Sequence, residues 1–175
     1  MALKRGIVKL ENYNKNWKKE YQKEATFLKE ILKDYILEIE HVGSTSVEGL
    51  LAKPIIDILI VINSFDDIPK IKNLLKDYGY INHGSHGIID RYFFTKGPDE
   101  ARTHYLHFTT PKSNTYYDLK YFKKYLINHP EYIKQYAKLK EDLASKYSNE
   151  RPKYTSGKHE FISKVISLAK EEYGD

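Results

Sequence analysis

The sequence EHVGSTSVEGLLAKPIIDILIVI, residues 40–62, places a Gly-Ser turn shortly before the most apolar segment of the chain. Its second half, PIIDILIVI, is a run of aliphatic residues that only Asp57 interrupts after the first proline. Such a run is typical of a central strand covered on both faces. An ionised carboxylate is costly to bury alone. Asp57 is therefore predicted to be paired, hydrated or placed at a cleft near the start of the strand.

The Gly43–Ser44 turn follows the segment LEIEHV, whose alternating apolar and polar residues predict a half-buried strand. A glycine at this point can adopt a positive φ, and the backbone N–H groups after it can hold an anion. The hydroxyl groups of Ser44, Thr45 and Ser46 add donors, and so does the ammonium group of Lys53. The stretch predicts a phosphate-binding cradle beside a carboxylate, where a Mg²⁺ ion could bridge the carboxylate and a phosphate.

The rest of the chain predicts an α+β fold. Apolar residues at three- to four-residue spacing indicate a helix in NWKKEYQKEATFLKEILKDYI, a second in SFDDIPKIKNLLKDYGY, and a helical cluster after Pro111. DRYFFTK (90–96) and THYLHFTT (103–110) are predicted strands joined by a GPDE turn, and NHGSHG (82–87) is expected to be a connecting loop. We expect one domain over 1–175, with a small mixed sheet of four or five strands flanked by an N-terminal helix and a C-terminal helical cluster.

Composition narrows the class of protein. The 175 residues include no cysteine, which excludes disulfides and thiolate metal sites and favours a reducing cytoplasm. No apolar run is long enough for a membrane span, and the first residues lack the apolar core of a secretory signal. The formal net charge of +5 is compatible with a phosphate-bearing small-molecule partner. A nucleic-acid partner is not expected, because the lysines are spread along helices and not gathered with aromatic residues.

Two histidines and a glutamate could act together with Asp57. By strand alternation, His104 and His107 point to opposite faces of the sheet, and His107 is the one expected to approach Asp57. A neutral histidine there could serve as a general base or a metal ligand, or could simply pair with the carboxylate. Glu40, on the strand before the turn, is a further candidate metal ligand.

Arginine is scarce in this chain, which draws attention to Arg91 and Arg102. Each lies beside a predicted strand and could clamp a phosphate or carboxylate through two hydrogen bonds. The alternative is a structural ion pair with Asp57, Asp90 or Glu100. The two histidines of NHGSHG are not expected to form a metal site.

The spacing of Gly-Ser, twelve residues and then a strand aspartate resembles the nucleotidyltransferase (polymerase β-like) superfamily. More narrowly, GSTSVEGLLAKPIIDI, RTHYLHF and YFKKYLINHPE resemble the signature of the GrpB family, from about residue 6 to residue 170. The resemblance implies a nucleotidyltransferase-type sheet in which carboxylates bind Mg²⁺. Superfamily enzymes carry a second carboxylate two residues after the first, where this chain has Leu59. The GrpB pattern also has an acidic residue where this chain has Lys124.

Three functions are compatible with these features. The first is a nucleotidyltransferase-type enzyme that binds a nucleoside triphosphate with Mg²⁺, holds phosphate on the Gly43 turn and uses Asp57 as a metal ligand. The second is a non-catalytic module that binds a nucleotide or another anion and has lost the chemistry, which the missing second carboxylate favours. The third is a small-metabolite hydrolase or transferase that uses Asp57 with His107, since one fold hosts unrelated chemistries.

Overall fold

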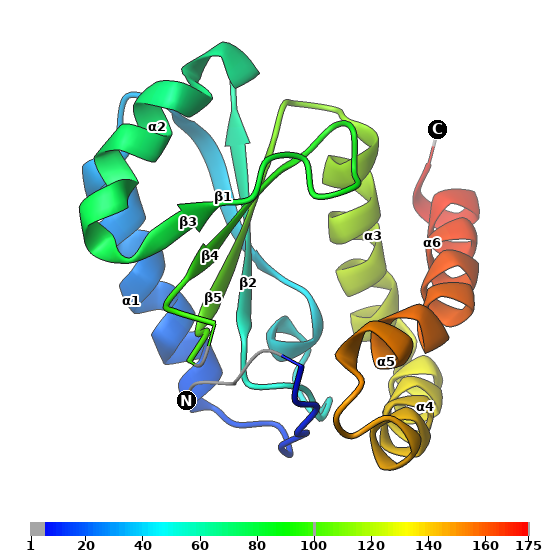
Figure 1. Ribbon diagram of the computed structural model, residues 1–175. Coiled ribbons are helices and arrows are strands. Elements are labelled where there is room, and N and C mark those ends of the chain that lie inside the picture. The colour runs from blue at the N-terminus through cyan, green and yellow to red at the C-terminus, as the bar shows by residue number, and fades with distance from the viewer. Residues whose placement is uncertain (1–5, 100, 175) are drawn as a thin grey trace.

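The computed structural model describes residues 6–99 and 101–174, in which the strands and two helices come first and a run of helices follows (Figure 1). The strands are β1 (Ile36–Val42), β2 (Ile56–Ile62), β3 (Tyr80–Asn82), β4 (Tyr92–Lys96) and β5 (His104–Thr109). The helices are α1 (Asn16–Ile31), α2 (Ile68–Leu75), α3 (Asn114–Asn128), α4 (Pro130–Lys146), α5 (Arg151–Gly157) and α6 (His159–Tyr173), with 3₁₀ turns at Ser44–Ser46, Phe65–Asp67 and Lys76–Tyr78. The predicted α+β class is confirmed.

The five strands form one mixed sheet in the order β1-β2-β5-β4-β3. β2 pairs antiparallel with β1 and parallel with β5, and the remaining pairs are antiparallel. The apolar segment that opened the sequence analysis is therefore an inner strand, as a continuous aliphatic run predicts. The parallel register sets Asp57 beside Tyr105 and Leu59 beside His107, so that all four residues share one face of the sheet.

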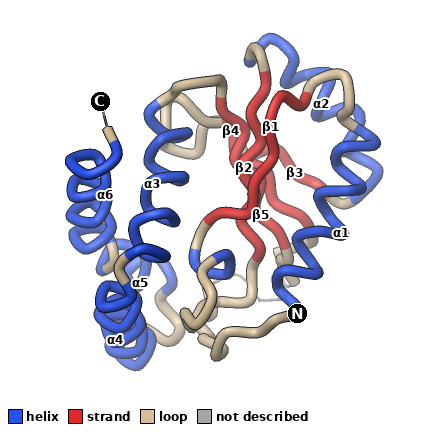
Figure 2. The backbone as a smooth tube through the Cα atoms, turned by 180° about the vertical axis from the view of Figure 1, so that it is seen from behind, coloured by secondary structure: helices blue, strands red, loops and turns tan. Residues whose placement is uncertain are grey.

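Helices cover both faces of the sheet (Figures 1 and 2). α1 and α2 lie on one face, while α3 and the cluster α4–α6 lie on the other. Ile56, Ile58, Ile60 and Ile62 point toward α1 and α2 and belong to the largest hydrophobic cluster. Their neighbours Leu59 and Val61 point the other way and pack with Val42 and with Tyr116 and Leu119 of α3. The alternation of β2 thus places Asp57 on the face that α3–α6 cover.

The structure differs from the expectation at two points. The N-terminal helix ends at Ile31, and a turn over 32–35 leads into β1 at Ile36. A short strand, β3, pairs with β4 immediately before the NHGSHG loop and was not predicted, because three residues are too few to show a period. Part of the predicted GPDE turn, Glu100, lies outside the described residues. Over the described part of the chain, no helix is both long and apolar enough to cross a membrane.

His41 is a buried titratable group on the α1 face of β1. Its ring stacks on Tyr21 with 4.8 Å between centroids and 7° between planes, and its Nε2 lies 2.9 Å from Thr45 Oγ1. Burial, helped by the positive charge of Lys123 and opposed by Asp57, lowers the pKa of His41 to about 4. Protonation of this ring therefore opposes the folded state.

We expect the free energy of unfolding to fall as the pH is lowered from 6.5 to about 4, because the pKa of His41 is 6.5 in the unfolded chain and about 4 in the folded one. The contribution of His41 is present above pH 6.5 and decreases by roughly 3 kcal/mol across that window. Urea unfolding at several pH values measures it. His41→Asn should reduce the slope, while His159→Asn, at an exposed position of α6, should not. An unchanged slope in His41→Asn would contradict the assignment.

Candidate functional site

The Gly43 turn and Asp57 meet at one corner of the sheet. Gly43 has φ +72° and ψ −173°, a backbone conformation that essentially only glycine adopts. A Cβ atom at this position would lie 2.7 Å from Asp57 Oδ2 and 3.0 Å from Asp57 Cβ. Glycine is thus required twice, by its dihedral angles and by the carboxylate packed against it. The corner predicted from sequence spacing exists, with the carboxylate in contact with the turn.

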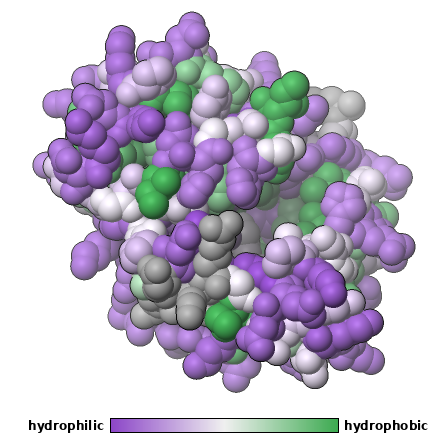
Figure 3. Space-filling model, viewed as in Figure 1, coloured by the Kyte–Doolittle hydropathy of each residue, from purple (hydrophilic) through white to green (hydrophobic). Residues whose placement is uncertain are grey.

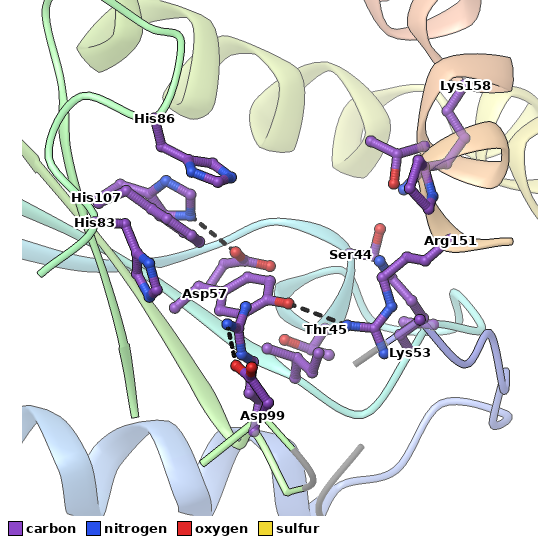
Figure 4. Close-up of a pocket in the computed structure, with 18 of the residues that line it drawn as sticks. Ser44, Thr45, Lys53, Asp57, His83, His86, Asp99, His107, Arg151 and Lys158 are labelled. Carbon is purple, nitrogen blue, oxygen red and sulfur yellow. Dashed lines mark hydrogen bonds and ion pairs between the residues drawn. The ribbon is translucent and has the colours of Figure 1, made fainter. Parts of the chain in front are cut away.

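This corner is part of a cleft of about 860 Å³ between the sheet and the C-terminal helices. The space-filling view shows a recess between the sheet half and the helical half of the molecule (Figure 3). The cleft is within the size range of pockets that bind small molecules. The close-up shows Asp57 near its centre, the histidines of β5 and the NHGSHG loop on one side, and Lys53, Arg151 and Lys158 on the other (Figure 4).

Asp57 is held by a chain of hydrogen bonds through His107 to Arg91. Asp57 Oδ1 lies 2.8 Å from His107 Nε2, and His107 Nδ1 lies 3.3 Å from Arg91 Nη1. A guanidinium can only donate, so Nδ1 accepts and Nε2 carries the proton that is donated to Asp57. In this tautomer His107 has no free lone pair for a proton or a metal. His107 reaches Asp57 as predicted, but the geometry makes it a group that positions the carboxylate.

The hydroxyl groups of the turn are used unequally. Ser46 Oγ donates to Gly43 O at 2.5 Å, and the buried Thr45 Oγ1 is bonded to His41. Of the three hydroxyl-bearing residues predicted to bind phosphate, Ser44 and Thr45 line the cleft and Ser46 does not. Glu40 lies on the same face of the sheet as Asp57 but pairs with Leu59 in the register and lines a different pocket, beside α3. It is not brought together with Asp57.

Both predicted arginines line the cleft, and each has a local partner. Arg102 Nη2 donates to Asp99 Oδ1 at 2.8 Å, an ion pair within one turn of chain. Arg91 donates to His107, and its guanidinium carbon lies 4.7 Å from the centre of the Phe93 ring. Asp90, one of the anticipated partners, instead caps the start of α3 through Thr115. Glu100, another, lies outside the described residues.

Sequence reasoning missed the wall contributed by α4–α6. Lys140, Arg151 and Lys158 all line the cleft, more than 80 residues along the chain from Asp57. Lys140 is only 2% exposed, and its Nζ donates to Leu51 O at 3.0 Å. Arg151 donates to Ile7 O at 2.7 Å. The scarcity of arginine, which drew attention to Arg91 and Arg102, applies equally to Arg151 and could have identified it. No local pattern distinguishes Lys140 and Lys158 from the many solvated lysines around them, so only the tertiary fold identifies these two.

The ammonium groups of the cleft repel one another. Burial, together with the charges of Lys158 and Arg151 and against that of Asp57, lowers the pKa of Lys53 to about 7. Burial likewise lowers the pKa of Lys158 to about 8, with Asp57 raising it and Arg151 lowering it. The pKa of Lys140 is held well below its ordinary value by burial and by Lys158 and Lys53. Positive charge in this cleft is under-compensated, which is the condition that favours anion binding.

A count of formal charges agrees with that conclusion. Two carboxylates among the described lining residues, Asp57 and Asp99, face six positively charged side chains. The cations are Lys53, Arg91, Arg102, Lys140, Arg151 and Lys158. The lining therefore carries a formal excess of four positive charges.

The residues around Asp57 do not fit a magnesium site built by the protein. Mg²⁺ prefers six oxygen ligands in octahedral geometry. Leu59, at the position of the superfamily's second carboxylate, is fully buried in apolar contacts. Within residues 6–99 and 101–174, no group of three or more histidine, aspartate or glutamate side chains could hold a metal ion.

Comparison with known proteins shows which family the chain resembles. The family model described as GrpB protein matches residues 7–168. The protein is 33% identical to the glutamate-rich protein GrpB of Alkalihalophilus pseudofirmus, over 95% of this chain and 98% of that one. It is 35% identical to YqkA of Bacillus subtilis, over 90% of this chain and 46% of that one. A crystal structure of the conserved protein GrpB from Enterococcus faecalis matches with a TM-score of 0.89 and 32% identity, covering 95% of this chain and all of that one.

The fold and the site thus define an α+β protein with a small mixed sheet, helices on both faces and a cationic cleft at a Gly-Ser corner. Within that class, this chain belongs to the GrpB family. The resemblance stated from GSTSV, AKPIIDI and RTHYLHF is thereby confirmed.

We expect Gly43→Ala to destabilise the protein by roughly 2–4 kcal/mol, because the new methyl group adds a clash with the Asp57 carboxylate to the strain of a positive φ. Gly49→Ala is the control, since Gly49 also has a positive φ, of +88°, but nothing lies within 4 Å of its Cβ position. Urea denaturation compares the two variants. Equal losses would show that the contact between Gly43 and Asp57 contributes nothing.

Proposed function

We propose that this protein binds a phosphate-bearing small molecule, with a nucleoside triphosphate as the first candidate, in the cleft between the sheet and α4–α6. The excess of positive charge around the Gly43 corner carries the proposal. Phosphate groups offer several acceptor oxygens and about one to two negative charges each, which suits clustered lysine and arginine donors. Ser44, which lines the cleft beside Gly43, adds a neutral hydroxyl group on the Asp57 side.

The end of the cleft that His86 and Phe93 line could accommodate the base of a nucleotide. His86 stacks against Phe93 with 5.1 Å between centroids and 26° between planes, and Phe93 in turn contacts Tyr105 and His107. His86 is exposed and lines the cleft. A flat heteroaromatic ring can stack on such a surface. The NHGSHG loop, expected to be only a connection, contributes part of this wall.

The carboxylate of Asp57 supports a second candidate, an enzyme of the nucleotidyltransferase type. Its side chain is 26% exposed within the cleft and is fixed by His107. A fixed, partly exposed carboxylate could accept a proton from an attacking hydroxyl group. The absence of a second carboxylate at Leu59 favours the binding function over this one.

Asp57→Asn separates the two candidates. If the cleft only binds an anion, this variant should bind a nucleoside triphosphate about three- to tenfold more tightly, since a nearby negative charge is removed without a change of shape. If the protein is a transferase, pyrophosphate release from the triphosphate should be lost. Calorimetric titration with the common nucleoside triphosphates measures the first, and a pyrophosphate assay measures the second.

The matched control is Asp142→Asn, which removes the same charge from an exposed position of α4. It should leave both measurements unchanged. Failure of every phosphate-bearing compound to bind the unmodified protein would reject both candidates.

Anion affinity should also decrease as the pH rises from about 6 to 9. Lys53 and Lys158 have pKa values of about 7 and 8, and they face each other, Lys140, Arg151, Asp57 and the Tyr154 ring. A bound anion raises both pKa values, so binding takes up protons across this window and weakens by at least about tenfold. Titration calorimetry in buffers of different protonation enthalpy measures the uptake. Lys53→Gln should take up fewer protons, and an unchanged uptake would contradict the assignment.

A further inference from the structure

The strongest positive charge in the cleft lies across from Asp57. Lys53 comes from the loop before β2, Lys140 from α4, Arg151 from α5, and Lys158 from the junction of α5 and α6. Figure 4 shows Lys53, Arg151 and Lys158 together on the side of the cleft away from the histidines. Four separate segments are thus folded so that their cationic ends converge. The near-complete burial of Lys140 excludes the simple explanation that these are solvated surface charges.

Tyr154 organises this cluster. Its ring is fully buried, and the Nζ atoms of Lys53 and Lys158 lie 5.3 and 4.6 Å from its centroid. The ring therefore holds two like charges close together. The hydroxyl of Tyr154 has no hydrogen-bond partner among the described residues. Tyr154 is not itself among the residues that line the cleft, so its contribution to a ligand is to position these two lysines.

Oxygen ligands for a divalent cation are lacking on the same wall. Asp57 Oδ1 accepts a hydrogen bond from His107 and Oδ2 packs against Gly43, so this carboxylate is already largely engaged by the protein. Asp99, the other carboxylate of the cleft, is paired with Arg102. A magnesium ion would therefore find at most one protein oxygen here, while a bare polyphosphate would find a formal excess of four positive charges. The side chains fit the polyphosphate better than the metal complex.

We infer that this cleft binds the polyphosphate chain of its ligand without a divalent metal ion, and that Lys53, Lys140 and Lys158 supply the neutralising charge. This inference rests on the proposed binding of a phosphate-bearing molecule. It adds that the molecule is recognised in its metal-free form. A triphosphate group carries roughly four negative charges near neutral pH, which matches the excess in the cleft. Magnesium would then compete with the lysines for the same phosphate oxygens.

Inorganic tripolyphosphate is the probe that isolates this recognition from any contribution of a base or sugar. It is titrated calorimetrically into the full chain, first with a chelator present and then with excess Mg²⁺. We expect binding in the chelator and about three- to tenfold weaker binding with Mg²⁺, because the metal neutralises the probe before the lysines can. Lys158→Gln and Lys53→Gln should each weaken metal-free binding about tenfold or more.

Lys164→Gln is the control for charge, because Lys164 is exposed on α6 and its loss changes the net charge equally. It should bind as the unmodified protein does, and Lys158→Arg should retain most of the affinity because the charge is kept. Thermal unfolding of each variant verifies the fold. Binding that requires Mg²⁺, or that Lys53→Gln and Lys158→Gln leave intact, overturns the metal-free inference and leaves the proposed function standing. No binding of tripolyphosphate in either condition also overturns the inference, and titration with the nucleoside triphosphates then decides whether the proposed function stands.

Discussion

The contact between Asp57 and the backbone of Gly43 is the constraint on which the site depends. The carboxylate occupies the space that any side chain at position 43 would need. The turn can therefore follow β1 only with a glycine at this point, and the start of β2 can approach it only with the carboxylate packed against that glycine. This contact brings the turn, the strand and the mouth of the cleft to one place. His107 and Arg91 then fix the orientation of the carboxylate from the neighbouring strands.

Much of the fold could be predicted because its apolar residues recur at the spacing of strands and helices. The aliphatic run of β2 identified an inner strand, and the alternation of THYLHFTT placed His104 and His107 on opposite faces, as the structure has them. His107 approaches Asp57, while His104 lies on the other face, 3.7 Å from Glu24 of α1. These results follow from a two-residue period that tertiary contacts do not change.

The site could be predicted only in part, because half of it is assembled by tertiary folding. The Gly-Ser turn and the strand carboxylate lie close in sequence, so their spacing carried information. Lys140 of α4 and Lys158, between α5 and α6, cannot be told from the many other lysines of this region until the helices are folded against the sheet. Hydrogen-bond partners were equally hidden: sequence could not show that Ser46 bonds to Gly43 or that Arg102 pairs with Asp99.

Lys53 and Lys158, both close to the Tyr154 ring, repel each other, and this repulsion lowers the stability of the fold. Any small anion that relieves this repulsion binds the native chain and not the unfolded one, and so raises the melting temperature. The melting temperature of the protein would therefore report whether a given anion binds. A melting-curve screen of small anions would rank them by this stabilisation, whether or not the protein catalyses a reaction.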